Sequence, residues 1–165
     1  SASQDQVYAG DYSGATSTGG TTPVAVAHPY SEGRQPTKFE YFWQETSNGN
    51  GAGFLLLDES GSEVFGFASD SPQWVVKDGN GTEQVASGTT NEFIRFTATI
   101  DWQNGTFDVD VEELSSGGTY TDSDRPLINS TDIYELRLVP FDTGSSGFES
   151  GVILEAWFDE IGVFA

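Results

Sequence analysis

The chain has 165 residues, with 26 aspartate and glutamate residues against 6 lysine and arginine residues, a formal net charge of −20, and neither cysteine nor methionine. This length corresponds to a single domain over residues 1–165, because domains contain about 100–200 residues. The lack of cysteine excludes disulfide scaffolds, thiolate metal sites and cysteine nucleophiles. The negative field disfavours nucleic acid as a partner. Because no apolar run approaches the ~20 residues of a membrane helix, we expect no membrane insertion.

The acid excess points to a solution environment. Only Lys38 and Lys77 represent lysine, and the carboxylates spread along the whole chain. Self-repulsion of this size destabilises a compact state in dilute buffer, whereas at molar salt the Debye length falls to ~3 Å and the repulsion is screened. We therefore interpret the chain as a halophilic protein, from an archaeon or its virus. A merely acidic domain is the alternative.

Three sequons begin at Asn80, Asn104 and Asn129, and each has the form of an N-glycosylation acceptor. Together with the lack of cysteine, they favour an extracellular, cell-surface or virion-surface location, with these three asparagines as candidate glycosylation sites. Chance occurrence is the alternative, because serine and threonine are abundant in the sequence.

Turn signals and short apolar runs divide the chain into strands. Residues 1–22 are small, polar and glycine-rich, which predicts an irregular N-terminal segment. We expect strands over residues 23–28, 38–46, 53–58, 63–68, 73–77, 82–86, 93–102, 106–112, 134–139 and 152–164. Hairpin signals lie at 47–51 and 78–81, and turns or loops are expected at 29–36, 115–124 and 143–151. Without a helical period of useful length, the fold class is all-β, a two-sheet antiparallel sandwich.

The strongest hairpin signal lies within residues 93–111. Apolar and polar residues alternate on both sides of Asn104-Gly105, the pair favoured in a two-residue type I′ turn. Such a turn fixes the register, so that Trp102 faces Phe107 and both apolar sets share one side of the sheet. The same register places Asp101 opposite Asp108.

Two motifs resemble the concanavalin A-like lectin/glucanase superfamily, and most closely its laminin-G-like domains. The motifs are the hairpin FIRFTATIDWQNGTFDVDV and the C-terminal EAWFDEIGVF. The matching residues are Trp102, Gly105, Thr106, Phe158, Asp159, Glu160, Ile161 and Val163. Over residues 38–165 the resemblance implies a jelly roll with one concave and one convex antiparallel sheet. This fold carries lectins, adhesion modules, hydrolases, lyases and viral fibre heads, so it implies no single function.

Aspartates supply the candidate metal ligands. The facing pair Asp101 and Asp108, with Asp110 on the diagonal, is repulsive by up to ~1 kcal/mol unless cations offset it. Hydrated salt cations are one explanation and a bound Ca²⁺, which favours carboxylate oxygens, is the other. The resemblance also implies a structural Ca²⁺ at Asp159 in the last strand, beside an N-terminal segment in which Asp11 is the candidate partner.

Catalytic motifs are weak. The strand pattern Glu-x-Asp-x-x-Glu of related glucanases is not present, and Asp108, Asp110 and Glu112 read as a solvated strand face. Glu135-Leu-Arg137 echoes part of a lyase motif, but the remaining lyase motifs are missing and His28 is the sole histidine. We therefore expect a protein that is not an enzyme, with a polysaccharide hydrolase or lyase kept as an alternative.

Aromatic side chains supply the candidate ligand-binding residues. Carbohydrate sites combine ring platforms with polar groups. Trp102 faces the core in the predicted register, whereas Trp74, Tyr120 and Tyr30 lie near breaks in the pattern and are the candidate surface rings. The sequence thus predicts a non-catalytic binding or adhesion module for a glycan or glycoprotein surface. A structural or receptor-binding part of a cell-surface or viral fibre, including a homo-oligomer, is the alternative.

Overall fold

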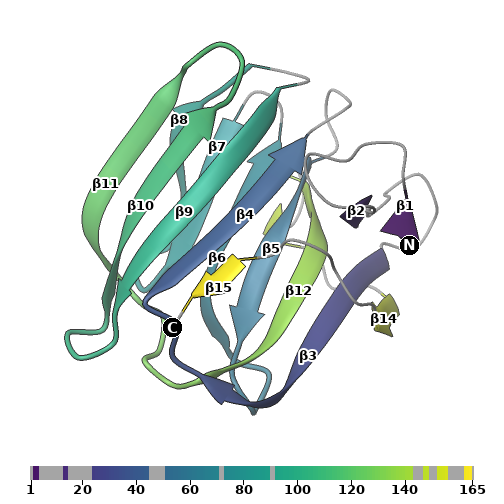
Figure 1. The fold of residues 1–165 in the computed structure, drawn as a ribbon, viewed down its shortest axis with the longest axis vertical. Coiled ribbons are helices and arrows are strands. Elements are labelled where there is room, and N and C mark those ends of the chain that lie inside the picture. Colours follow the sequence, from purple (N-terminus) through teal and green to yellow (C-terminus); the bar gives the residue numbers. More distant parts are fainter. Residues whose placement is uncertain are drawn as a thin grey trace.

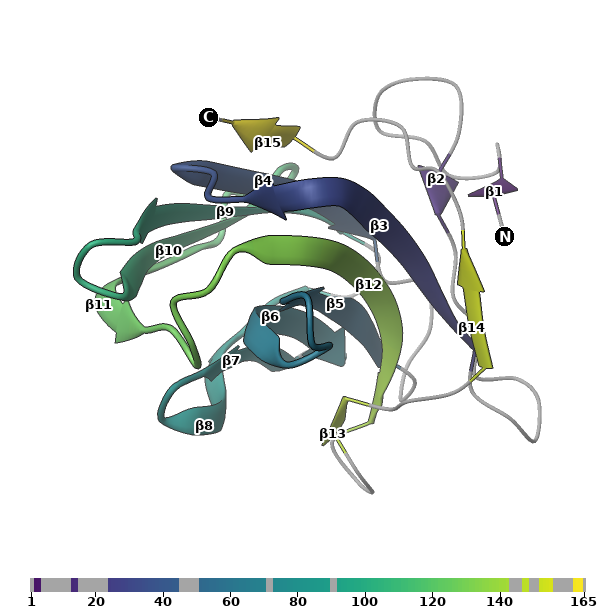
Figure 2. The same ribbon diagram turned by 90° about the horizontal axis from the view of Figure 1, so that it is seen from below.

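In the computed structural model, the described residues are 2–3, 13–14, 24–44, 51–70, 73–89, 92–142, 147–148, 152–155 and 162–164. They form two large β-sheets packed face to face, together with a small ribbon of β1 (Ala2–Ser3) and β2 (Ser13–Gly14) (Figures 1 and 2). The predicted all-β sandwich is therefore confirmed. No helix in the described part of the chain is long and apolar enough to cross a bilayer.

The smaller sheet has five strands. In spatial order they are β11 (Thr119–Pro126), β10 (Thr106–Glu113), β9 (Phe93–Asp101), β4 (Lys38–Gln44) and β15 (Gly162–Phe164). Every described pairing in this sheet is antiparallel. Burial alternates along β10, where Phe107, Val109 and Val111 face the core and Asp108 and Asp110 face solvent. This period of two is what places one face of a strand in the core.

The larger sheet has eight strands. In spatial order they are β14 (Val152–Glu155), β3 (Val24–Arg34), β12 (Ile133–Asp142), β5 (Gly51–Leu57), β6 (Glu63–Asp70), β7 (Gln73–Asp78) and β8 (Gly81–Ser87), with β13 (Gly147–Phe148) pairing on β12. The pairing of β14 with β3 is parallel and the others are antiparallel.

Aromatic rings fill the space between the sheets. Phe54 of the larger sheet lies within 5.2 Å, centroid to centroid, of Phe39, Tyr41 and Phe96 of the smaller one. A second apolar layer lies on the opposite face of the larger sheet, where Leu55, Leu57 and Phe141 are almost fully buried. Central strands of the larger sheet are therefore apolar on both faces, as expected for a covered sheet.

Three strand predictions are wrong. Residues 47–51 do not close a hairpin, because β4 and β5 belong to different sheets. Residues 152–164 are not one closing strand, because β14 and β15 also lie in different sheets. The predicted turn at 29–36 is largely strand, since β3 continues to Arg34 and carries Pro29 where β14 no longer pairs with it. Proline is tolerated on such an open strand side because the missing N–H has no partner to serve.

The predicted register of the β9–β10 hairpin is also wrong, by two residues. Thr106 faces Asp101 and Phe107 faces Ile100, so residues 102–105 form a four-residue loop. A type I′ turn needs positive φ at both central residues, but Gly105 has φ 68° and Asn104 is not in that region. Asp101 instead holds the loop by accepting hydrogen bonds from the Asn104 backbone N–H at 3.0 Å and its side-chain amide at 2.7 Å. A shift of two residues keeps every side chain on its predicted face.

Candidate functional site

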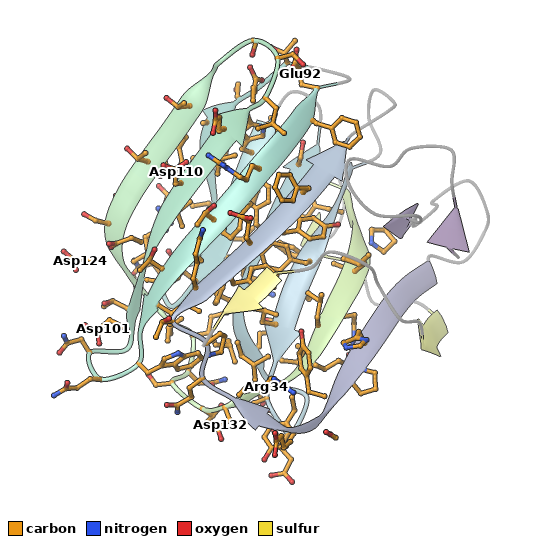
Figure 3. The ribbon with its side chains drawn as sticks, viewed as in Figure 1. Arg34, Glu92, Asp101, Asp110, Asp124 and Asp132 are labelled. Atoms are coloured by element: carbon orange, nitrogen blue, oxygen red, sulfur yellow. The ribbon has the colours of Figure 1, made fainter. Side chains whose placement is uncertain are left out.

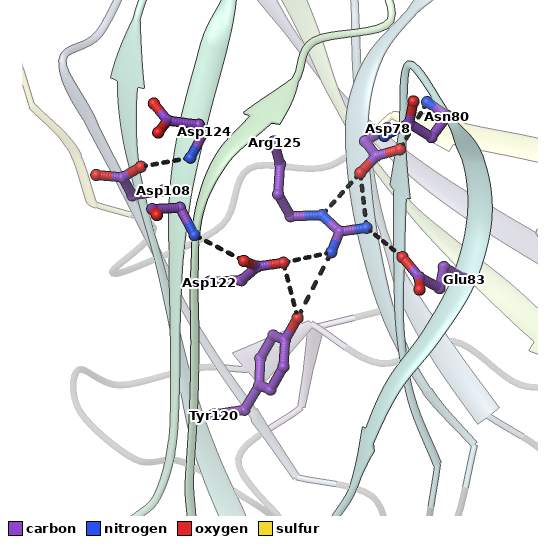
Figure 4. Close-up of polar contacts among 9 residues, drawn as sticks. Asp78, Asn80, Glu83, Asp108, Tyr120, Asp122, Asp124 and Arg125 are labelled. Atoms are coloured by element: carbon purple, nitrogen blue, oxygen red, sulfur yellow. Dashed lines mark hydrogen bonds and ion pairs between the residues drawn. The ribbon is translucent and has the colours of Figure 1, made fainter.

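Arg125 binds four polar side chains at the edge where β11 and β8 lie opposite each other (Figure 4). Arg125 faces Phe107 across the β10–β11 ladder, so its side chain points into the sandwich. Its Nε donates to Asp78 Oδ2 at 2.7 Å, and its Nη2 lies 2.8 Å from Glu83 Oε2. The guanidinium thus joins the edge strand of one sheet to β7 and β8 of the other.

The fourth and fifth members of this Arg125 network are Asp122 and Tyr120. Arg125 Nη1 donates to Asp122 Oδ2 at 2.8 Å, and the Tyr120 hydroxyl lies 3.5 Å from the same nitrogen. The Tyr120 hydroxyl also donates to Asp122 Oδ2 at 3.2 Å. A single planar guanidinium therefore fixes three carboxylates and a phenol, which its five N–H donors permit.

Burial divides the network into an inner pair and an outer rim. The side chains of Asp78 and Arg125 are 1% and 7% exposed, whereas those of Asp122 and Glu83 are 42% and 64% exposed. Asp78 also accepts a 2.8 Å hydrogen bond from the backbone N–H of Asn80, which fixes the β7–β8 turn. We refer to the outer residues Tyr120, Asp122 and Glu83 as the Tyr120 rim.

The ionisation of the network follows from these contacts. Burial opposes the charge of Arg125, but its hydrogen bonds to Glu83 and Asp122 prevail and raise the arginine pKa above its ordinary value. Burial likewise opposes ionisation of Asp122, but the hydrogen bonds from Arg125 and the Ser123 backbone lower its pKa. Burial and the charge of Asp122 raise the pKa of Tyr120. At neutral pH Asp122 is therefore an ionised acceptor beside the neutral phenol of Tyr120.

Sequence reasoning missed four members of this network, Arg125, Asp78, Glu83 and Asp122. It placed Tyr120 in a loop over residues 115–124, whereas Tyr120 lies on the edge strand β11 with its half-buried ring packed on the core. The available signal was Arg125 itself, because it ends the acidic run Asp122-Ser-Asp124 and no other cation lies near it in sequence.

The predicted facing pair of aspartates is wrong. Asp101 faces Thr106, Asp108 faces Thr99 and Asp110 faces Thr97, so none of the three lies opposite another carboxylate. Asp108 accepts a 2.9 Å hydrogen bond from the Asp124 backbone, whose φ of 58° marks an irregular point of β11. The described residues hold no group of three or more His, Asp or Glu side chains arranged for a metal ion. Asp11 and Asp159, the other candidate Ca²⁺ ligands, lie outside the described residues.

Of the three candidate surface rings, Trp74 is not on the surface. Its side chain is in the core with 3% exposure, because Trp74 lies on the inner face of β7 together with Val76. Gly88 makes room for the indole, since a Cβ there would lie 2.5 Å from the Trp74 ring. Tyr30 is half-buried on β3, where its ring meets His28 edge-on with 5.1 Å between centroids.

Trp102 packs against the main core, as predicted, but does not pair with Phe107. It lies half-buried in the four-residue loop, and its Nε1 donates to the backbone oxygen of Pro36 at 2.8 Å. The three sequon asparagines have different surroundings. Asn80 is exposed at the β7–β8 turn, the Asn104 amide donates to Asp101, and the Asn129 amide donates to the Glu63 backbone oxygen at 2.6 Å.

The residues that echo a lyase motif form an ordinary strand contact. Arg137 Nε donates to Glu135 Oε1 at 2.5 Å on β12, and both side chains are about one quarter exposed or less. His28 lies on the neighbouring strand β3, where it pairs with Leu136 of β12. Among the described hydrogen bonds, no third polar side chain binds Glu135 or Arg137, so the similarity to the lyase motif does not extend beyond these two residues.

Comparison with known proteins finds no sequence family and only distant structural similarity. No family model and no curated protein sequence matches the chain. Among solved structures, a scytalido-glutamic peptidase bound to a peptide-based transition state analogue matches with a TM-score of 0.47 and 10% identity over 77% of this chain and 70% of its own. CG-16, a homodimeric agglutinin from chicken liver, matches with a TM-score of 0.46 and 12% identity over 69% of this chain and 90% of its own.

Lactose- and MES-liganded congerin II matches with a TM-score of 0.41 and 15% identity over 61% of this chain and 81% of its own. The agglutinin and congerin are galectins and the peptidase is an eqolisin, and both groups have concanavalin A-like jelly-roll folds. The described residues themselves show an all-β sandwich of two sheets.

Proposed function

We propose that the protein is a non-catalytic module that binds a glycan or glycoprotein surface at the Tyr120 rim. The observation that carries the proposal is that the guanidinium of Arg125 holds two exposed carboxylates, those of Asp122 and Glu83, and contacts the hydroxyl of Tyr120. Rings and convergent acceptors are the groups with which proteins bind sugars. A buried arginine, Arg125, holds both acceptors in place.

The chemistry of the rim suits hydroxyl donors. Each carboxylate offers four acceptor sites, and Arg125 occupies only part of this capacity on Asp122 and Glu83. Hydrogen bonds from sugar hydroxyls to ionised carboxylates are charge-assisted and short. They therefore persist at ionic strengths that screen long-range attraction. Because the acceptors are already fixed, binding loses little side-chain entropy.

Ionisation of the described carboxylates supports binding in preference to cleavage. A glycosidase acid needs a raised pKa so that it holds a proton near neutrality. The described carboxylates with a displaced pKa are Asp58, Asp101 and Asp122, and all three are displaced downward. Hydrogen bonds from Ser60 lower the Asp58 pKa, and those from Asn104 lower the Asp101 pKa. These groups are suited to accept hydrogen bonds and not to deliver protons.

A glycan array in about 2 M NaCl, where surface charge is screened, tests the proposal. Tyr120→Ala removes the ring and Asp122→Asn removes an ionised acceptor. The matched control is Glu59→Gln, which removes one charge from an exposed residue in the β5–β6 turn. We expect array hits for wild type and Glu59→Gln, with affinity about tenfold lower or worse in the two rim variants.

Thermal unfolding of each variant separates loss of binding from loss of fold. Equal affinity of all folded variants for the best glycan would contradict the proposed site. Release of shortened sugars or peptides from any array hit would contradict the non-catalytic assignment.

A further inference from the structure

Arg34 differs from the other cations of the chain. All six lysine and arginine residues lie in the described part, and five of them pair with a carboxylate: Lys38, Lys77, Arg95, Arg125 and Arg137. Among these described residues, Arg34 alone makes no ion pair, and its side chain is exposed. In so acidic a chain, an arginine that pairs with none of the described carboxylates is unexpected.

An aromatic ring positions Arg34 in place of a carboxylate. The guanidinium carbon of Arg34 lies 5.4 Å from the centroid of the Tyr30 ring, within the range of a cation–π contact. Tyr30 is itself held, because it packs on the main core and meets the His28 ring edge-on. Stacking on a ring face leaves the planar N–H donors of arginine free to bind at their edge.

The backbone on both sides of Arg34 is fixed. A Cβ at Gly33 would lie 2.7 Å from Asp132 Cβ and from a ring carbon of Tyr134, so this glycine is packed tightly against the start of β12. On the other side, Gln35 Nε2 donates to Asp132 Oδ1 at 2.8 Å. The carboxylate of Asp132 is therefore bound by Gln35 and not by Arg34. Figure 3 shows Arg34 and Asp132 at one end of the molecule, away from Glu92 and Asp110.

From this geometry we infer that Arg34 is a binding point for the carboxylate of an acidic sugar, a hexuronate. This inference rests on the proposed glycan binding, but Arg34 lies on β3 and shares no residue with the Tyr120 rim. A planar guanidinium matches a carboxylate through two parallel hydrogen bonds, which a hydroxyl cannot provide.

In dilute buffer the charge of the chain favours a singly charged ligand. A net charge of −20 repels anions in proportion to their own charge, so at low ionic strength a monoanionic carboxylate is favoured over a sulfate or phosphate dianion. In molar salt the remaining repulsion is screened, while contacts between the guanidinium and the carboxylate persist at short range.

The test uses galacturonic acid as probe, with galactose and acetate as comparison ligands, titrated into the full chain in about 2 M NaCl and followed by NMR. Arg34→Ala removes the site. Arg95→Ala is the matched control, because it removes the same charge from a paired surface arginine. Arg34→Lys keeps the charge without the planar fork.

We expect wild type and Arg95→Ala to bind galacturonic acid with equal affinity, Arg34→Ala to bind about tenfold more weakly or not at all, and Arg34→Lys to lie between them. Three results would overturn the inference: unchanged affinity in Arg34→Ala, equal binding of galactose, or equal binding of acetate. If neutral glycans still bind in a Tyr120-dependent manner while galacturonic acid does not bind, this inference fails alone. If neither class binds, the proposed function fails with it.

Discussion

The Arg125 network makes a quantitative prediction about stability. Replacing Arg125 by methionine fills a similar volume but leaves the carboxylate of Asp78 buried, with the Asn80 backbone N–H as its remaining described hydrogen-bond donor. Removing one partner of a buried ion pair costs about 3–5 kcal/mol, because the other charge stays desolvated. The exposed partners Glu83 and Asp122 add little, since surface pairs contribute ~0–1 kcal/mol each. We therefore expect Arg125→Met to lower the unfolding free energy by about 3–5 kcal/mol.

Urea unfolding in constant molar NaCl, followed by tryptophan fluorescence, measures this loss. Arg95→Met is the control, because it makes the same charge change in a pair whose side chains are 40% and 35% exposed, and it should cost at most ~1 kcal/mol. Adding Asp78→Asn to Arg125→Met removes the stranded charge and keeps an acceptor for Asn80, so the double variant should be more stable than Arg125→Met. A cost no larger than that of Arg95→Met, or no recovery in the double variant, would refute the reasoning.

Two further predictions concern acid and salt. The pKa values of Asp122 and Asp101 are lower in the folded chain than in an unfolded one. Their contribution to stability is therefore complete above about pH 4 and is lost as pH falls through their folded pKa values. Acid titration followed by circular dichroism should show this loss, and stability unchanged down to about pH 2 would contradict it. Because we propose that the chain works in brine, its urea midpoint should rise steeply from about 0.1 to about 2 M NaCl as repulsion is screened, whereas a flat response would contradict the halophilic assignment.

The β9–β10 hairpin shows how far sequence reasoning reaches. Alternation predicted both strands and the buried face correctly, because side-chain direction repeats every two residues. The turn could not be predicted from Asn104-Gly105 alone. Its loop depends on the Asp101 carboxylate, which binds both donors of Asn104, and on Trp102, which bonds to Pro36 far away in sequence. The register therefore depends on the long-range contact of Trp102 with Pro36 as well as on the local contacts of Asp101.

The edge strand β11 was missed for a related reason. Its sequence, TYTDSDRP, has neither apolar alternation nor β-branched runs beyond its threonines. What holds it is pairing with β10 and the contact of Arg125 with Asp78 on the other sheet. Trp74 illustrates the opposite error, because a preceding serine–proline pair suggested a surface position while its side chain lies in the main core cluster. The candidate site emerged only from tertiary contacts, although the sequence had singled out Tyr120.

Chemical-shift mapping of the backbone amides, with the strongest array glycan added in molar salt, examines the binding proposal most directly. We expect the largest shifts at Tyr120, Asp122 and Glu83, saturation at a single affinity, and a glycan recovered intact after prolonged incubation. Shifts confined to strands remote from these residues, or a glycan recovered in pieces, would contradict the proposal that this rim binds without cutting.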